Sequence, residues 1–190
     1  MIEVFNKEFE LIKSEKNREN LKKVVSMLPE YFFHVAASST GKYHPSFTLG
    51  DGGLVRHSKV AFKIGYELLK NNTIGSAFKE EEKDLLLCAI LVHDGLKHGL
   101  VESKYTVFEH PILMSKFLLE NKDKFTWSDE EVKFIADAIK THMGEWTKDY
   151  QGNEVLDRPT NKYQKFVHMC DFLASRKFLD VKFENNDIIE

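Results

Sequence analysis

The chain carries its longest apolar run, Leu85-Leu86-Leu87-Cys88-Ala89-Ile90-Leu91-Val92, directly before the pair His93-Asp94. The run predicts the end of a buried helix that begins near Lys79. An imidazole and a carboxylate at the end of such a helix are placed where both can hold one cation. This stretch therefore predicts the core of the fold and, at its end, a metal-binding pair.

The rest of the chain also reads mostly as helix. An amphipathic pattern predicts one helix over about residues 3–28, ended by Pro29. Pro111 suits the first turn of a helix, with His110 at its mouth, and Ser128-Asp129-Glu130-Glu131 is a capping box that opens another. Further helices are predicted over residues 54–70, over 79–92 and from Thr160 onwards.

Two segments predict loops. Residues 38–53 are rich in glycine and small residues, and residues 144–159 read as a long loop with a short hairpin around Gln151-Gly152-Asn153. No convincing strand pair is expected. The fold class is therefore predicted to be all-α, with residues 1–190 forming a single domain.

The composition is that of one soluble globular domain, with 190 residues of which 42% are hydrophobic and 30% charged. No apolar run approaches the roughly 20 residues of a membrane-spanning helix, and the charged N-terminus does not resemble a signal peptide. Cys88 and Cys170 lie in apolar helical patterns and are expected to be buried reduced thiols, which favours a cytoplasmic location. A net charge of −3 argues against polymeric nucleic acid as a partner, and a homo-oligomer is compatible with the sequence.

Further candidate metal ligands lie on or beside other predicted helices: His57, His110, His142 and Asp171. A single histidine near an apolar face is more often structural, but a carboxylate such as Asp171 is costly to bury without a partner. Together with His93 and Asp94, these residues form the ordered series His, His-Asp, His, His, Asp. We therefore expect a metal site between the helices.

Imidazole and carboxylate ligands suit two divalent cations drawn from Mn, Fe, Ni, Co, Zn and Mg. Only a carboxylate can bridge two cations, so Asp94 is expected to join them. The remaining ligands divide into His57, His93 and Asp171 for one cation, and His110 and His142 for the other. Two cations about 3.5–4 Å apart generate hydroxide at neutral pH and clamp a phosphoryl oxygen.

These motifs resemble the HD-domain superfamily, all-helical metal-dependent phosphohydrolases named after the His-Asp pair. The resemblance rests on four segments: Gly52-Gly53-Leu54-Val55-Arg56-His57, His93-Asp94-Gly95-Leu96-Lys97, Thr141-His142-Met143-Gly144, and the segment from Val167 to Arg176. It implies an HD-type helical bundle in which residues 1–50 form an N-terminal helix and loop and residues 53–176 form the metal-binding core.

An upstream segment, Lys42-Tyr43-His44, is similar to the Lys-x-His-His motif of bacterial HD-type 3′-to-5′ exoribonucleases. Here Pro45 stands where the second histidine would be, and the chain has no room for the oligonucleotide-binding domain of those enzymes. The departures argue against an exonuclease and leave the phosphohydrolase chemistry itself untouched.

The resemblance implies a divalent-metal-dependent phosphohydrolase, either a phosphodiesterase or a nucleotidase. A hydroxide bridging the two metals would attack the phosphorus of a nucleotide or another small phosphoester. Asp94 and Lys97 would be catalytic, with Lys97 stabilising the charge that develops. Two alternatives stay open: an HD-type di-iron oxygenase with the same ligand order, and a non-catalytic nucleotide-binding or regulatory module.

Candidate substrate contacts are side chains that could bind phosphate or stack on a ring: Lys42, Tyr43, His44, Lys104, Trp146 and Arg176. Surface packing is an equally good interpretation for each of them, and Arg176 could instead pair with Asp180. His168 is expected to be a hydrogen-bond partner of the ligands. His98 is expected to be exposed near a helix end.

Overall fold

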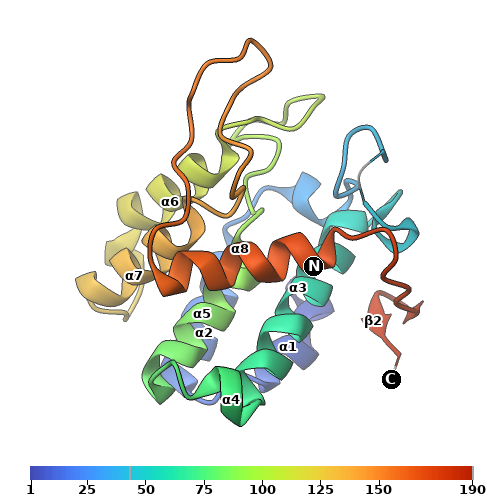
Figure 1. Ribbon diagram of the computed structural model, residues 1–190. Coiled ribbons are helices and arrows are strands. Elements are labelled where there is room, and N and C mark those ends of the chain that lie inside the picture. Colours follow the sequence, from blue (N-terminus) through green and yellow to red (C-terminus); the bar gives the residue numbers. More distant parts are fainter. Residues whose placement is uncertain (43, 190) are drawn as a thin grey trace.

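Helices dominate the computed structural model, which describes residues 1–42 and 44–189 (Figure 1). The α-helices of this part of the chain are α1 (Asn6–Glu10), α2 (Glu15–Ser26), α3 (Gly53–Lys70), α4 (Asn72–Gly75), α5 (Glu80–Val92), α6 (His110–Glu120), α7 (Asp129–Ile139) and α8 (Lys162–Ala174). Short 3-10 helices cover Ile2–Phe5, Glu30–Phe33, Ser46–Thr48 and Lys122–Lys124. The predicted all-α, single-domain fold class is confirmed.

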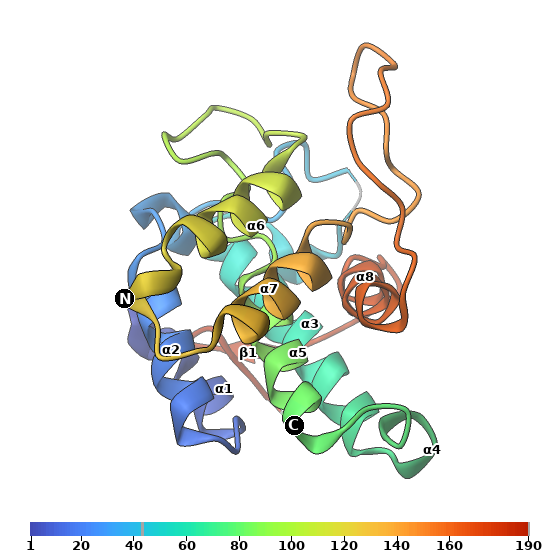
Figure 2. The same cartoon turned by 90° about the vertical axis from the view of Figure 1, so that its left-hand side faces the viewer.

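The helix that ends in the His-Asp pair lies at the centre of the bundle. Every residue of α5 from Asp84 to Val92 is buried. Helix α3 runs beside α5, α8 crosses both, and α2 and α7 pack on other sides of α5 (Figures 1 and 2). A helix enclosed in this way is apolar all round, which explains the unbroken hydrophobic run in the sequence.

Most of the predicted helices begin and end near their expected residues. The predicted capping box opens α7, because the Ser128 hydroxyl accepts a hydrogen bond from the Glu131 N–H and the Glu131 carboxylate accepts one from the Ser128 N–H. Asn161 rather than Thr160 caps α8. The loop at 144–159 carries the predicted short hairpin contact, a single bridge between Lys148 and Glu154. Cys88 and Cys170 are both buried free thiols.

The single N-terminal helix predicted over residues 3–28 is wrong, because the chain breaks between α1 and α2. Ser14 caps α2, accepting a hydrogen bond from the Asn17 N–H. The buried carboxylate of Asp84 on α5 accepts hydrogen bonds from the backbone N–H groups of Lys13 (3.2 Å) and Ser14 (2.7 Å). A side chain 70 residues further along the chain therefore satisfies the amides that the break exposes.

A small hairpin near the C-terminus was not expected from the sequence. Strands β1 (Phe183–Glu184) and β2 (Asp187–Ile188) pair in antiparallel fashion. Asn185 and Asn186 connect them with positive φ angles of 50° and 67°, the backbone conformation that suits a two-residue hairpin turn. Asparagine tolerates this conformation better than other residues with side chains, which was the available sequence signal.

A buried lysine ties this hairpin and the N-terminal helix to the bundle. The Lys59 side chain on α3 is 0% exposed. Its ammonium contacts the carboxylates of Glu8 on α1 at 3.0 Å and Asp187 on β2 at 2.8 Å. Burial raises the pKa of Glu8, although Lys59 opposes this by favouring the charged carboxylate. The two ends of the chain thus meet at one buried ion-pair cluster.

No helix among the described residues is long and apolar enough to cross a membrane. The long connections before α3, between α5 and α6, and between α7 and α8 all gather at one end of the bundle (Figure 1). His93-Asp94 lies at the same end of α5. These three loops therefore surround the position where the sequence predicts metal ligands.

We expect Lys59→Met to lower the free energy of unfolding by about 3–5 kcal/mol, because Glu8 would stay buried without its counter-charge. Urea denaturation measures the change. Lys70→Met, on the exposed end of the same helix, is the matched control and should change stability by less than about 1 kcal/mol. Equal effects of the two substitutions would contradict the proposed role of the buried cluster.

Candidate metal centre

All six predicted ligands come together in the structure, although they are spread over more than a hundred residues. His57 lies on α3, His93 and Asp94 follow α5, and Asp171 lies on α8. His110 is the first residue of α6, and His142 lies in the turns after α7. The ligating atoms of three overlapping groups each lie within 4.8 Å of one another: His57, His93 and Asp94; His93, His142 and Asp171; Asp94, His110 and His142.

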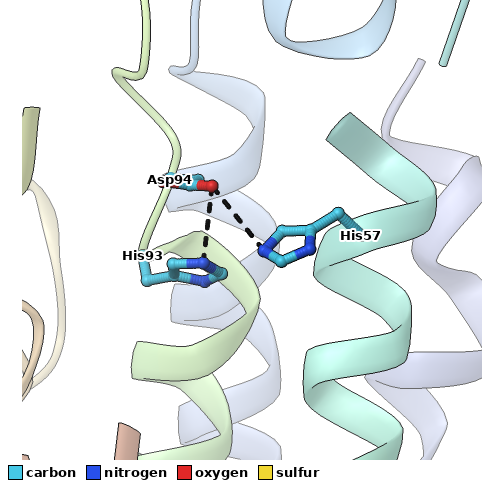
Figure 3. Close-up of side chains that lie close together, drawn as sticks. All are labelled: His57, His93 and Asp94. Carbon is cyan, nitrogen blue, oxygen red and sulfur yellow. Dashed lines mark ion pairs between the residues drawn. The ribbon is translucent and has the colours of Figure 1, made fainter. Parts of the chain in front are cut away.

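Local sequence explains how the first histidine reaches this position. Gly53 begins α3 against the preceding loop, where a Cβ atom would lie only 2.0 Å from the carbonyl oxygen of Thr48. No other residue could therefore start the helix so close to that loop. His57 follows one turn later and points toward the end of α5 (Figure 3).

Asp94 stands between two sets of ligands. Its Oδ2 lies 3.8 Å from Nε2 of His57 and 3.5 Å from Nε2 of His93 (Figure 3). Its Oδ1 lies 3.0 Å from Nε2 of His110 and 3.4 Å from Nε2 of His142. Each carboxylate oxygen therefore faces a different pair of imidazoles.

Asp171 completes the first of these sets. Its Oδ1 lies 3.0 Å from Nε2 of His57 and 3.5 Å from Nε2 of His93. Nitrogen and oxygen ligands bind a first-row divalent ion at about 2.0–2.2 Å, so neighbouring ligands of one ion lie about 3 Å or slightly more apart. The donor atoms therefore lie close enough together to share a cation.

Backbone carbonyls fix the direction of three imidazoles. Nδ1 of His93, His110 and His142 lies 2.6, 2.7 and 3.0 Å from the carbonyl oxygens of Ile90, Val107 and Ile139, respectively. Each Nδ1 therefore donates its proton to the carbonyl oxygen, so that in the neutral imidazole the lone pair of Nε2 faces the cluster.

This arrangement could accommodate a cation. Nε2 of His110 and Nε2 of His142 lie 3.1 Å apart, so when both Nδ1 atoms carry the proton, the two Nε2 lone pairs face each other. Nε2 of His93 and Oδ1 of Asp94 are buried and have no hydrogen-bond partner among the described residues. Buried polar atoms without partners are costly. A metal ion would satisfy all of them, so the cluster could hold one.

The pKa values of the two carboxylates favour their charged forms. Burial alone would raise the pKa of Asp94, but Lys97 and His93 lower it well below its usual value. His57 and His93 do the same for Asp171. Both residues therefore offer anionic oxygens over the whole physiological pH range.

The pKa values of three of the predicted histidine ligands are shifted, in two different directions. Burial lowers the pKa of His57, and it lowers that of His142 to about 4. Burial also disfavours charge on His93, but Asp94 and Asp171 outweigh it and raise its pKa. Because a histidine binds metal only when neutral, metal binding at His93 is expected to release a proton.

Lys97 is the second predicted catalytic residue that the structure brings to the cluster. Its side chain is buried, and its ammonium lies 2.5 Å from Oδ2 of Asp94. A buried ammonium beside the ligands is expected to favour an anionic group bound there. Lys97 is therefore buried beside the ligands and not solvated at the surface.

The predicted substrate contacts behave differently from one another. The His44 ring packs edge-on against that of His57 at 5.4 Å, and burial lowers the pKa of His44 to about 3. Its Nδ1 is buried and has no hydrogen-bond partner among the described residues. Tyr43 lies outside the described residues. Lys42 and Lys104 are exposed on loops, Lys104 over the ring of Tyr105. Neither lysine shares a described contact with the six ligands.

Trp146 and Arg176 meet on a ring that the sequence did not single out. Trp146 stacks on Phe172 with a centroid distance of 6.2 Å and an interplanar angle of 21°. The Arg176 guanidinium lies 3.9 Å from the centroid of the same ring. Its hydrogen bonds run to Ser175 and the Phe172 carbonyl, and it forms no ion pair with Asp180 in the described part of the chain. Phe172 directly follows the predicted ligand Asp171, and this adjacency is the sequence signal that could have identified Phe172.

His168 supports the ligands through the backbone. Its Nδ1 donates to the carbonyl oxygen of His142 at 2.7 Å. Gly144 has a positive φ of 67°, and a Cβ atom there would lie 2.1 Å from the His168 ring. The loop therefore needs glycine at this position to bring His142 and His168 together.

His98 is buried, against the expectation of an exposed residue. Its ring packs on that of Tyr31 at 5.5 Å, and the Tyr31 hydroxyl accepts a hydrogen bond from the His98 N–H. The contact joins segments 67 residues apart, which explains why local sequence gave no sign of it. The imidazole Nε2 has no hydrogen-bond partner among the described residues.

Comparisons with known protein families, with curated proteins and with solved structures found no match for this chain.

The depressed pKa of His142 predicts a pH dependence of stability in the metal-free protein. Between pH 6.5 and about 4 the unfolded chain binds a proton at His142 and the folded chain does not, so unfolding becomes easier as the pH falls through this window. Urea denaturation at pH 6.5, 5.5 and 4.5 measures the slope. His142→Gln cannot take up the proton and is expected to show a shallower slope. An unchanged slope would contradict the burial of a neutral imidazole.

Proposed function

We propose that this chain is a divalent-metal-dependent phosphohydrolase of the HD superfamily, acting on a nucleotide or another small phosphoester. The observation that carries the proposal is Asp94, whose two oxygens face two different pairs of imidazoles. A carboxylate in that position suits two cations, one on each side. One would be held by His57, His93 and Asp171, and the other by His110 and His142, with Asp94 shared.

The charge of the cluster supports an anionic substrate. With the histidines neutral, Asp94 and Asp171 contribute two negative charges and Lys97 one positive charge, so the side chains leave one net negative charge. Two divalent cations would turn this into a strongly positive site, and a small phosphoester would neutralise part of the excess. Such an excess, buried from water, favours phosphate over a neutral substrate.

Two divalent cations in such a site supply a nucleophile at neutral pH and neutralise charge on the phosphoryl group. The side chains of the chain itself have separate tasks. The carbonyls of Ile90, Val107 and Ile139 hold three imidazoles in one tautomer and orientation. The Lys97 ammonium, which contacts Oδ2 of Asp94, would donate to a phosphoryl oxygen as negative charge develops on it.

The resemblance in the sequence adds to this proposal. The order of the ligands along the chain and the position of Lys97 are those of the phosphohydrolase motifs, and the same residues gather in space. The di-iron oxygenase alternative uses the same ligand order, so the metal and the substrate must be tested together.

We expect metal-stripped protein to hydrolyse p-nitrophenyl phosphate, bis-p-nitrophenyl phosphate or members of a nucleotide panel once it is reconstituted with Mn, Mg, Ni, Co, Zn or Fe. Asp94→Asn should abolish turnover because the two ligand sets lose their shared oxygen. Lys97→Met should lower kcat by roughly a hundredfold, which is typical for the loss of one group that stabilises developing charge.

Lys116→Met, on the exposed surface of α6, is the matched control and should retain full activity. Absence of turnover with every metal would refute the hydrolase proposal. Iron in the protein as isolated, together with substrate-dependent oxygen uptake, would then favour the oxygenase. Tight nucleotide binding without turnover would favour a regulatory module.

A further inference from the structure

The six ligands of the cluster differ in how far solvent reaches them. The side chain of Asp171 is 17% exposed, whereas the side chains of the other five ligands are at most 1% exposed. Asp171 lies on α8. Among the described residues, the most accessible approach to the ligands is therefore at Asp171, on the side of α8.

Two aromatic rings and a guanidinium group pack together beside Asp171. Phe172 follows Asp171 on α8, about 100° further around the helix. Arg176 lies just beyond the C-cap residue Ser175, and its side chain folds back onto Phe172. The Phe172 ring carries the Arg176 guanidinium at 3.9 Å and lies nearly parallel to the indole of Trp146. Along the chain, Trp146 lies in the loop that follows His142, and Phe172 directly follows Asp171. The indole and the phenyl ring are therefore each close in sequence to a ligand of the cluster.

Trp146 is held in place although it is exposed. The residue is 45% exposed, an unusual state for the largest aromatic side chain. Gly144 and Thr147 fix the loop on either side of it: Gly144 packs against His168, and buried Thr147 accepts backbone hydrogen bonds from Val155 and Leu156. An exposed ring on a loop that is held in one conformation is preorganised to bind a flat ligand, because little conformational entropy is lost on binding.

We propose that Trp146, Phe172 and Arg176 form the subsite for the base of a nucleotide substrate, an inference that rests on the proposed phosphohydrolase function. Base-on-indole stacking is tolerant of sequence and favourable for every base. Arg176 is free of carboxylate partners among the described residues and adds a cation for the base or its phosphate. The phosphoester would lie over Asp171, with the base one sugar away on the flank of α8.

The fluorescence of Trp146 gives a test that needs no turnover. The chain has two tryptophans, and the other, Trp127, is buried against Phe125. Adenosine 5′-monophosphate added to metal-loaded protein is expected to quench the Trp146 emission, and ribose 5-phosphate, which has no base, is not. The quenching should vanish in Trp146→Leu, which retains Trp127.

Kinetics give the second test. Trp146→Leu and Phe172→Leu should each lower kcat/KM for adenosine 5′-monophosphate by about tenfold or more, mainly through KM. The kcat/KM for ribose 5-phosphate should not change. Phe178→Leu, an exposed phenylalanine beyond the end of α8, is the matched control and should leave both values unchanged.

The outcomes separate this inference from the function on which it rests. Equal losses for both substrates, or no loss for either, would refute the base subsite while leaving the phosphohydrolase in place. If wild-type protein hydrolyses no phosphoester, the proposed function fails, and quenching alone decides the subsite. Quenching by the nucleotide and not by ribose 5-phosphate would then support it, and equal or absent quenching would refute it.

Discussion

The buried carboxylate of Asp94 is the constraint on which the rest of the structure depends. A charged group that is 1% exposed is stable only with compensating partners. The chain supplies one of them directly, the Lys97 ammonium from the next turn. It also surrounds the carboxylate with imidazoles from α3, from α6 and from the segments that follow α5 and α7, and a cation shared with these imidazoles would supply the rest. Because these segments are far apart in the sequence, the bundle must be closed before the carboxylate is satisfied. The geometry of the site therefore depends on the complete packing of the bundle.

Packing around the central helix α5 fixes the position of the site. Since every residue of α5 from Asp84 to Val92 is buried, packing fixes the register of this helix against α3, α7 and α8 and brings His93-Asp94 to one place at its end. Backbone carbonyls one turn before each of three histidines then set the ring orientation. The connections before α3, between α5 and α6, and between α7 and α8 gather at the end of α5 where His93-Asp94 lies (Figure 1). Rigid helices thus position the ligands, while loops shape the approach of a substrate.

Local patterns predicted the helices and the composition of the cluster, and tertiary contacts decided what the sequence missed. The apolar run before His93 and the capping box at Ser128 are local signals, and both gave the correct elements. The break before α2 depends on Asp84, which lies 70 residues away. The burial of His98 depends on Tyr31, 67 residues away. The division of ligands between the two oxygens of Asp94 followed from chemistry, because only a carboxylate can face two sides at once.

The central claim is that Asp94 joins two cations. Electron paramagnetic resonance of metal-stripped protein titrated with Mn²⁺ tests it most directly. We predict binding of two ions per chain with the spectrum of an exchange-coupled pair, because one bridging carboxylate holds the ions within about 4 Å of each other. Replacement of the exposed His34, as in His34→Asn, should leave this spectrum unchanged. One ion with an uncoupled six-line spectrum, or no ordered binding, would contradict the claim.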